Sequence, residues 1–270
     1  MPPIKDAFAA AVTPATPALV VVKEWDLTDV TAADVSAAGA HAITTAGGAA
    51  LVTITTGTEA SAPTSISADL VAGASGGLVV DLQTTSDARD WVFYWPIPVT
   101  DIDLAVDAWM IEFLFADVTL TATSNNSTMS WGMSTTTVMN GEPFQGMLLK
   151  NTASNMYWTV RRKDAGSSSD GAATIDTGRI SGENIHMQII GQNRGALVYK
   201  DSATEFSDTY MSSPTMTGTT GSKSVNASAG APTLWGTPYI ICKNYLRYAG
   251  NRWQFKLRKV RLCKFTPHSA

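Results

Sequence analysis

Apolar and polar residues alternate with a period of two along most of the chain. Segment 109–123, WMIEFLFADVTLTAT, is a clear example, and such alternation is typical of a strand with one buried face. Clusters of Gly, Ser, Asn and Pro separate these segments and indicate turns. The pattern predicts strands at 18–25, 50–57, 77–84, 91–98, 109–123, 156–164, 185–192, 195–201, 237–244 and 251–265.

This density of short strands, with almost no helical periodicity, predicts an all-β fold. Turn signals recur at intervals of about 8 to 15 residues, which favours an antiparallel β-sandwich or jelly roll. Residues 1–60 are rich in Ala, Thr and Pro and hold only two aromatic residues, Phe8 and Trp25. We therefore expect 1–60 to be an irregular N-terminal arm or small subdomain and 61–270 to be the sandwich domain.

The last predicted strand, 251–265, combines an apolar face with a cationic one. Trp253, Phe255 and Leu257 share one face, and the apolar phase then resumes one residue late at Val260 and Leu262. A slip of one residue is what a β-bulge produces. The cationic residues of this strand are Arg252, Lys256, Arg258, Lys259 and Arg261.

Charge is unevenly distributed along the chain. Residues 1–149 hold sixteen acidic residues but only three basic ones, whereas no Asp or Glu follows Asp208. Three uses compete for the cationic strand face: binding nucleic acid, protecting a sheet edge, and docking against an acidic surface. The acidic net charge of −4 and the lack of a stacking row disfavour nucleic acid. We prefer docking, either on a neighbouring chain or on residues 1–149.

Composition narrows the class of protein further. Charged residues make up only 16%, which suits a β-protein that presents much of its surface to other proteins. Two cysteines, Cys242 and Cys263, cannot form a disulfide framework, and we expect them to be free thiols in a reducing cytoplasm. No signal peptide or membrane span is expected. Motifs for nucleotides, zinc or other cofactors are absent, so no cofactor is expected.

Aromatic and acidic residues supply the candidate ligand sites. Trp91 and Trp95, with Trp131 from another strand, would bind a glycan if their rings were exposed, although a strand buried on both faces gives the same pattern. Asp101, Asp103 and Asp107 are clustered and would be the oxygen ligands of a calcium ion, but solvated turn acids explain them equally.

Hydrolysis of a glycoside requires two carboxylates across a cleft. Glu112 and Asp117 in EFLFAD are the leading pair, but a spacing of five places them on opposite faces of a regular strand. His186 alternates with apolar neighbours and reads as a structural residue. We therefore do not expect an enzyme.

WMIEFLFAD, then MYWTVRRKD and IHMQIIGQNRGALVYKD, and finally WQFKLRKVRL resemble the strand succession of concanavalin A-like (laminin G-like) jelly rolls of the kind found in bacteriophage virion proteins. The likeness covers about 200 residues. It implies two stacked antiparallel sheets, the last strand returning beside the first. The functions it implies range from glycan binding to glycosidases to inert virion parts.

These observations together predict a non-enzymatic virion structural protein, such as a capsid decoration protein, head fibre or tail appendage, that acts by protein–protein assembly. It would be assembled in the host cytoplasm with other virion proteins and would form a homo-oligomer, for which the symmetry of such particles makes a trimer one candidate. The alternative is a carbohydrate-binding or receptor-binding module of a phage fibre, whose partner is a host surface glycan.

Overall fold

The predicted strands form in the computed structural model of the chain, and its described residues contain no helix, membrane-spanning or otherwise. The structure describes residues 19–28, 30, 40–44, 50–56, 66–72, 77–84, 89–97, 100–104, 107–121, 128–134, 144–151, 156–164, 167–178, 181–190, 195–200, 222–223, 239–246 and 252–265.

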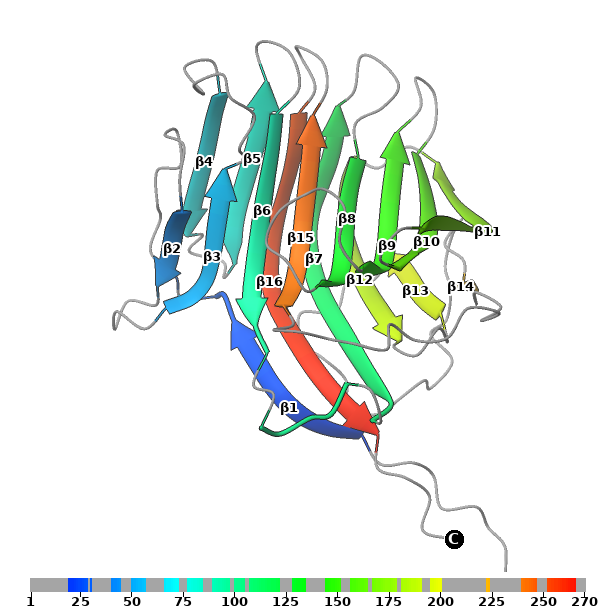
Figure 1. Cartoon of the computed structure of the whole chain (residues 1–270). Coiled ribbons are helices and arrows are strands. Elements are labelled where there is room, and N and C mark those ends of the chain that lie inside the picture. Colours follow the sequence, from blue (N-terminus) through cyan, green and yellow to red (C-terminus); the bar gives the residue numbers. More distant parts are fainter. Residues whose placement is uncertain are drawn as a thin grey trace, which may run out of the picture.

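Two antiparallel sheets of eight strands face each other, which confirms the all-β sandwich (Figure 1). The β16 sheet has the order β14 (Ser222–Lys223), β13 (Gly195–Lys200), β12 (Ser181–Ile190), β7 (Trp109–Thr121), β16 (Arg252–Phe265), β5 (Leu78–Thr84) and β4 (Ile66–Ala72), and β1 (Leu19–Asp26) also pairs with β16. The β15 sheet has the order β11 (Ser167–Gly178), β10 (Met156–Asp164), β9 (Phe144–Asn151), β8 (Thr128–Ser134), β15 (Tyr239–Leu246), β6 (Arg89–Pro96), β3 (Ala50–Thr56) and β2 (Ala40–Thr44).

Strand β16 changes its neighbour halfway along its length. Residues 252–257 pair with β5, and residues 259–265 pair with β1 instead. The register against β7 shifts between Leu257 and Lys259, so Arg258 is the extra residue of a β-bulge, which confirms the predicted slip. The backbone N–H of Leu27 donates to the Arg258 carbonyl (2.9 Å) and fixes the end of β1 at this bulge.

The N-terminal segment is built into both sheets. β1 pairs with β16, while β2 and β3 extend the β15 sheet beside β6. The expected boundary at residue 60 therefore does not separate an arm from the sandwich over residues 19–56. A low aromatic content does not prevent strand formation, because backbone pairing of β1 with β16, of β2 with β3 and of β3 with β6 places these strands in the sheets. Residues 1–18 lie outside the described residues.

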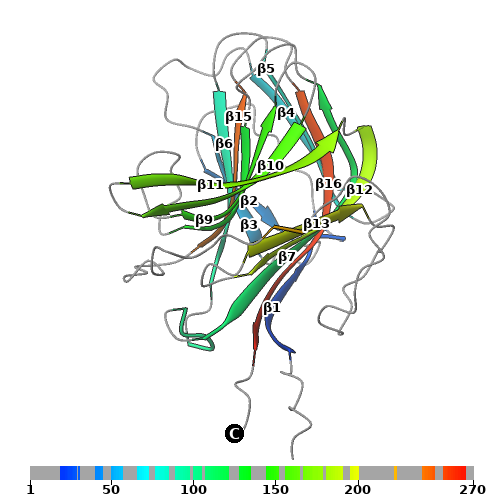
Figure 2. The same cartoon turned by 90° about the vertical axis from the view of Figure 1, so that its right-hand side faces the viewer.

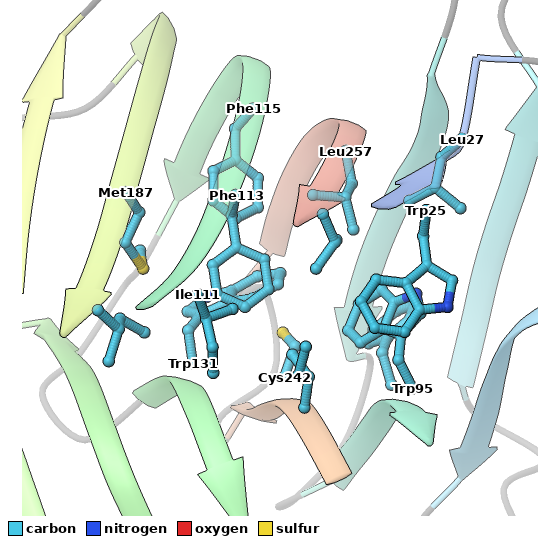
Figure 3. Close-up of a cluster of buried hydrophobic side chains, with 14 of the residues drawn as sticks. Trp25, Leu27, Trp95, Ile111, Phe113, Phe115, Trp131, Met187, Cys242 and Leu257 are labelled. Atoms are coloured by element: carbon cyan, nitrogen blue, oxygen red, sulfur yellow. The ribbon is translucent and has the colours of Figure 1, made fainter. Parts of the chain in front are cut away.

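The core fills the space between the two sheets (Figures 2 and 3). Trp131 on β8 packs edge-on against Phe113 and Phe115 of β7 and Phe255 of β16, with ring centroids 5.0, 4.6 and 5.7 Å apart. Aromatic pairs of this geometry contribute about 0.5–1.5 kcal/mol beyond the area they bury. They join β7 and β16 to the opposite sheet, so the outward-facing side chains of these strands are held on a rigid base.

Candidate functional site

Polar side chains gather on the face of the β16 sheet that points away from the core. On β7 the residues Ile111 and Phe113 enter the core, so Glu112 between them points outward. The same alternation directs His186 and Gln188 of β12 and Arg261 of β16 to this outer face. Gln188 and Arg261 both lie directly opposite Glu112 in the strand registers. We call Glu112, His186, Gln188 and Arg261 the polar quartet.

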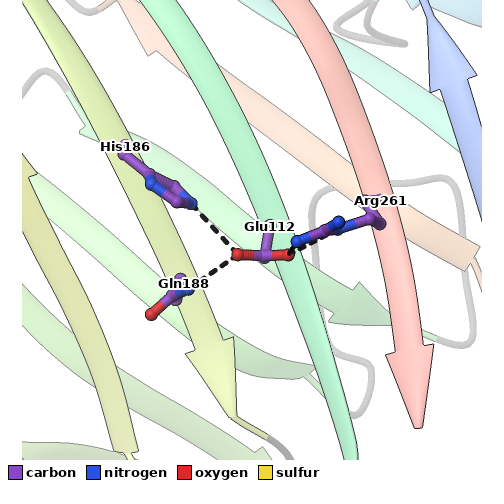
Figure 4. Close-up of polar contacts among 4 residues, drawn as sticks. All are labelled: Glu112, His186, Gln188 and Arg261. Atoms are coloured by element: carbon purple, nitrogen blue, oxygen red, sulfur yellow. Dashed lines mark hydrogen bonds and ion pairs between the residues drawn. The ribbon is translucent and has the colours of Figure 1, made fainter. Parts of the chain in front are cut away.

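The carboxylate of Glu112 is the centre of the polar quartet (Figure 4). Gln188 Nε2 donates to Glu112 Oε1 (2.6 Å), and His186 Nε2 lies 3.1 Å from the same oxygen. Arg261 Nε donates to Oε2 (2.6 Å), and Arg261 Nη2 lies 2.5 Å from that oxygen. Each carboxylate oxygen thus has two partners, which is its full capacity as an acceptor.

Burial governs the electrostatics of this site. The exposed fractions are 1% for Glu112, 2% for Arg261, 5% for His186 and 7% for Gln188. Burial alone would raise the pKa of Glu112, but the hydrogen bonds from His186 and Gln188 and the charge of Arg261 outweigh it and hold that pKa below its usual value. The carboxylate is therefore ionised at neutral pH and unavailable as a proton donor.

A second group of charges attaches β1 to the sheet. Lys259 is 7% exposed, and its Nζ lies 3.7 Å from Glu24 Oε1 and 3.5 Å from Asp26 Oδ2. Burial acts to raise the pKa of Asp26, but hydrogen bonds from Thr28 and the charge of Lys259 lower it overall. The end of β1 is thus bound to the second half of β16 by ion pairs as well as by backbone pairing.

The first half of β16 is also paired within the chain. Arg252 Nε donates to Asp81 Oδ1 (2.6 Å) and Nη2 pairs with Asp81 Oδ2, which raises the pKa of Arg252. Lys256 Nζ lies 3.6 Å from Asp117 Oδ2. Arg258, at the bulge, has a buried Nε with no hydrogen-bond partner.

These contacts concern the expected docking of the cationic strand face on an acidic surface, either of a neighbouring chain or of residues 1–149. Within the described part of the chain, the acids that pair with β16 are Glu24, Asp26, Asp81, Glu112 and Asp117, and these five belong to the acidic first half of the sequence. The bulge at Arg258 and the change of neighbour from β5 to β1 bring these acids against the strand. The ion pairs between β16 and acidic residues that the structure describes thus lie within one chain.

The predicted glycan-binding tryptophans are core residues where their side chains are described. Trp95 is fully buried and Trp131 is 1% exposed, so neither ring presents a face to solvent. The physical reason is that both rings belong to the core between the two sheets. Trp91 lies on β6 opposite Asn244, and its side chain lies outside the described part of the chain.

The predicted calcium ligands do not converge on one point. Asp107 Oδ2 instead accepts a hydrogen bond from the backbone N–H of Asp103 (2.9 Å), and the Asp107 N–H donates to the Asp103 carbonyl (2.7 Å). Asp101 contributes its carbonyl to Lys264 Nζ (2.7 Å). Among the described residues, no three Asp, Glu, His or Cys side chains form a group that could hold a metal ion. Hydrogen bonding within a turn explains this cluster.

The carboxylates considered for glycoside hydrolysis are likewise in separate ion pairs. Glu112 is buried against Arg261, whereas Asp117 is largely exposed and pairs with Lys256. Asp117 has φ of 53° and sits where the β7 register shifts against both neighbouring strands. This bulge turns Asp117 away from the regular strand and out to solvent.

The sequence did not predict the polar quartet as a unit. A signal was nevertheless present, because Glu112 interrupts the apolar run WMIEFLF and His186 and Gln188 alternate with apolar residues in IHMQII. Charged or polar residues at such positions require partners when both faces of a strand are buried. What the sequence lacked was the register that selects Arg261.

Known proteins resemble this chain in structure but not detectably in sequence. No protein-family model matches the sequence, and no curated protein matches it. The carbohydrate esterase of Shiga toxin-encoding bacteriophage phi24B is similar in structure, with a TM-score of 0.50, 10% identity, and coverage of 92% of this chain and 100% of that one.

Two further structures are less similar. The CBM2 module of the evolved Dit of Lactobacillus casei BL23 phage J-1 has a TM-score of 0.46 and 10% identity, covering 95% of this chain and 100% of that one. Alginate lyase A1-II′ of polysaccharide lyase family 7 has a TM-score of 0.43 and 12% identity, covering 73% and 84%. At such identities the likeness concerns the fold alone.

Proposed function

We propose that this chain is a non-enzymatic structural component of a bacteriophage particle that acts by protein–protein assembly. The observation that carries the proposal is strand β1. Among the described strands it pairs only with β16, and it bears Val20 and Val21, which are 38% and 45% exposed. No other large apolar side chain is exposed among the residues whose burial is described.

An edge of this kind favours contact with another protein. Neighbouring residues of a strand point to opposite faces, so Val20 and Val21 give β1 an apolar side chain on each face. An edge strand with apolar side chains and free backbone groups is a template for adding a further strand. Natural edges usually carry protection such as a bulge, and the register of β1 against β16 shifts once, between Val21 and Lys23, just after the two exposed valines.

The internal use of the polar side chains supports a role without catalysis. Glu112 has no free lone pair and is closed off from solvent by its partners, so it cannot act on a substrate as found here. The particle context rests on the predicted virion character of the sequence. The similar fold of the phi24B esterase supports this context, because that protein comes from a bacteriophage. Its esterase activity is not carried over to this chain.

Light scattering on the full chain tests the proposal, at roughly 50 and 500 mM salt, a range that changes charge screening severalfold. We expect a stable oligomer at both concentrations, because the β16 cations Arg252, Lys256, Lys259 and Arg261 are paired within the chain. Val21→Lys should weaken the oligomer, while the matched control Thr100→Lys, at another exposed position, should not. A monomer under all conditions, or turnover of polysaccharides, would overturn the proposal.

A carbohydrate-binding module is the second candidate, and one observation favours it. Tyr94 and Tyr239 are partly exposed on the outer face of the β15 sheet and form an edge-to-face pair with centroids 5.5 Å apart. Such a pair offers a ring face to a sugar in place of the buried Trp95 and Trp131. A glycan array with the native chain and with Tyr94→Ala tests it, since binding that survives the substitution would exclude this aromatic pair.

A further inference from the structure

We infer that His186, Gln188 and Arg261 form a carboxylate-binding site that the chain fills with its own Glu112, and that a small free carboxylate binds there when this side chain is removed. The inference is independent of the proposed function, because it concerns the interior of one chain.

The arrangement of donors matches a carboxylate rather than any other group. Four contacts of 2.5 to 3.1 Å reach the two oxygens of Glu112, two at each oxygen. A carboxylate has about four lone-pair positions on two coplanar oxygens and accepts at all of them. A carboxamide would place its NH₂ group against donors on one side. The site therefore selects a planar monoanion with two equivalent oxygens.

The donors are positioned without help from Glu112. His186 and Gln188 alternate along β12 with Ile185, Met187 and Ile189, whose side chains are in the core. Arg261 stands between Val260 and Leu262, which are fully buried in the same core. Removal of the Glu112 side chain leaves these anchors in place, so the donors remain directed at one point.

Low exposure makes the site strong once it is vacated. Arg261 is 2% exposed, and a buried guanidinium without a counter-ion is strongly disfavoured. Glu24 faces Arg261 from the other side in the strand register, and its Oε1 lies 3.7 Å from Lys259 Nζ. A carboxylate from solution and a rearranged Glu24 would each neutralise Arg261, and they give different experimental results.

The test uses the full chain with Glu112→Ala and sodium formate or acetate as the probe, at ionic strength matched with sodium chloride. We expect a saturable rise in the thermal midpoint of the variant, on the order of 5 °C, with formate or acetate but not with chloride or acetamide. The native chain and Glu112→Gln, in which the space is filled, should show no such rise. ¹³C-labelled formate should show saturable binding to the variant by NMR.

Two further measurements keep the outcome decisive. If Glu112→Ala does not fold in chloride, refolding from urea with and without formate gives the yield of folded protein, and formate should raise it. In Glu112→Ala with Arg261→Met, the cation is gone and formate should have no effect. Equal behaviour in formate and chloride, with no labelled formate bound, would overturn the inference and point to Glu24 as the replacement. A formate effect that persists without Arg261 would overturn it as well.

Discussion

Glu112 and Arg261 are 149 residues apart in the sequence, yet they lie directly opposite each other on β7 and β16 and form a buried ion pair at 2.5 to 2.6 Å. The pair sits on the face of the sheet that points away from the core, with both side chains almost fully buried. Only one strand register brings the two charges together. The pair therefore helps to fix the register of two central strands.

Loss of the cation should be more harmful than loss of the whole pair. Arg261→Met leaves the carboxylate of Glu112 buried beside only His186 and Gln188, and breaking such a pair costs about 3–5 kcal/mol. We expect the free energy of unfolding, measured with urea at neutral pH, to fall by that amount.

The double variant Glu112→Met with Arg261→Met is the control. It has no buried charge in the pair, so it should recover part of the stability, but not all, because His186 and Gln188 lose their acceptor. A single Arg261→Met variant within about 1 kcal/mol of the native chain would show that the pair is balanced by its own desolvation.

Acid should destabilise the protein through Glu112. Its folded pKa lies below the ordinary value of 4.5, so the unfolded chain takes up a proton first as the pH falls. The stabilising contribution is complete above the unfolded pKa and is lost as pH falls through the lower folded pKa. Asp26 has the same sign, since its pKa is also lowered.

Urea titrations between about pH 3 and pH 6 measure this effect. Glu112→Gln keeps the size of the side chain but cannot ionise, so its unfolding free energy should depend less steeply on pH than that of the native chain. The dependence that remains in the variant includes Asp26. Identical slopes for the two proteins would mean that Glu112 does not contribute.

The sequence predicted the strands whose alternation is strong and missed those without it. WMIEFLFADVTLTAT and IHMQII became β7 and β12, and the slip of apolar phase in β16 became a bulge at Arg258. The cluster DAGSSSDGAA, residues 164–173, indicates a turn because it is rich in Ser and Gly, but most of it lies in the edge strand β11, Ser167–Gly178. Pairing with β10 supplies the stability that its own side chains lack.

Site prediction failed where it depended on which face of a strand is covered. Trp95 and Trp131 look alike in sequence whether they are exposed or buried, and both are in the core. The ion pairs of β16 depended on long-range register, which no local pattern encodes. The uneven distribution of charge was nevertheless visible in the sequence. It indicated that acids of the first half could pair with the basic last strand within one chain.

Lys259 should control how firmly β1 is held. Lys259→Met removes both ion pairs, to Glu24 and Asp26, but keeps a side chain of similar length. Because both acids are partly exposed, the pairs are worth about 0.2–1 kcal/mol each, and amide hydrogen exchange in β1 should accelerate roughly two- to thirtyfold. Exchange in β12, which does not contact Lys259 in the strand pairing, should be unchanged.

Arg252→Met is the matched control for this experiment. Arg252 is on the same strand but pairs with Asp81 of β5, before the bulge. Its loss should leave exchange in β1 at the native rate. Equal acceleration of exchange in β1 by both variants would contradict this prediction. It would mean that ion pairs before the bulge at Arg258 stabilise β1 as much as those after it.

Gly77 should be intolerant of any side chain, for two separable reasons. Its φ is 143°, a conformation that residues with a Cβ rarely adopt, and a Cβ there would lie 2.5 Å from Lys256 Cγ and 3.3 Å from the Leu257 carbonyl oxygen. We expect Gly77→Ala to lower the unfolding free energy by about 1–3 kcal/mol in urea denaturation. Adding Lys256→Ala should relieve the contact with the lysine but not the backbone strain, so it should restore only part of the loss. Full recovery in the double variant would show that the backbone conformation costs little and that the lysine contact is the whole effect.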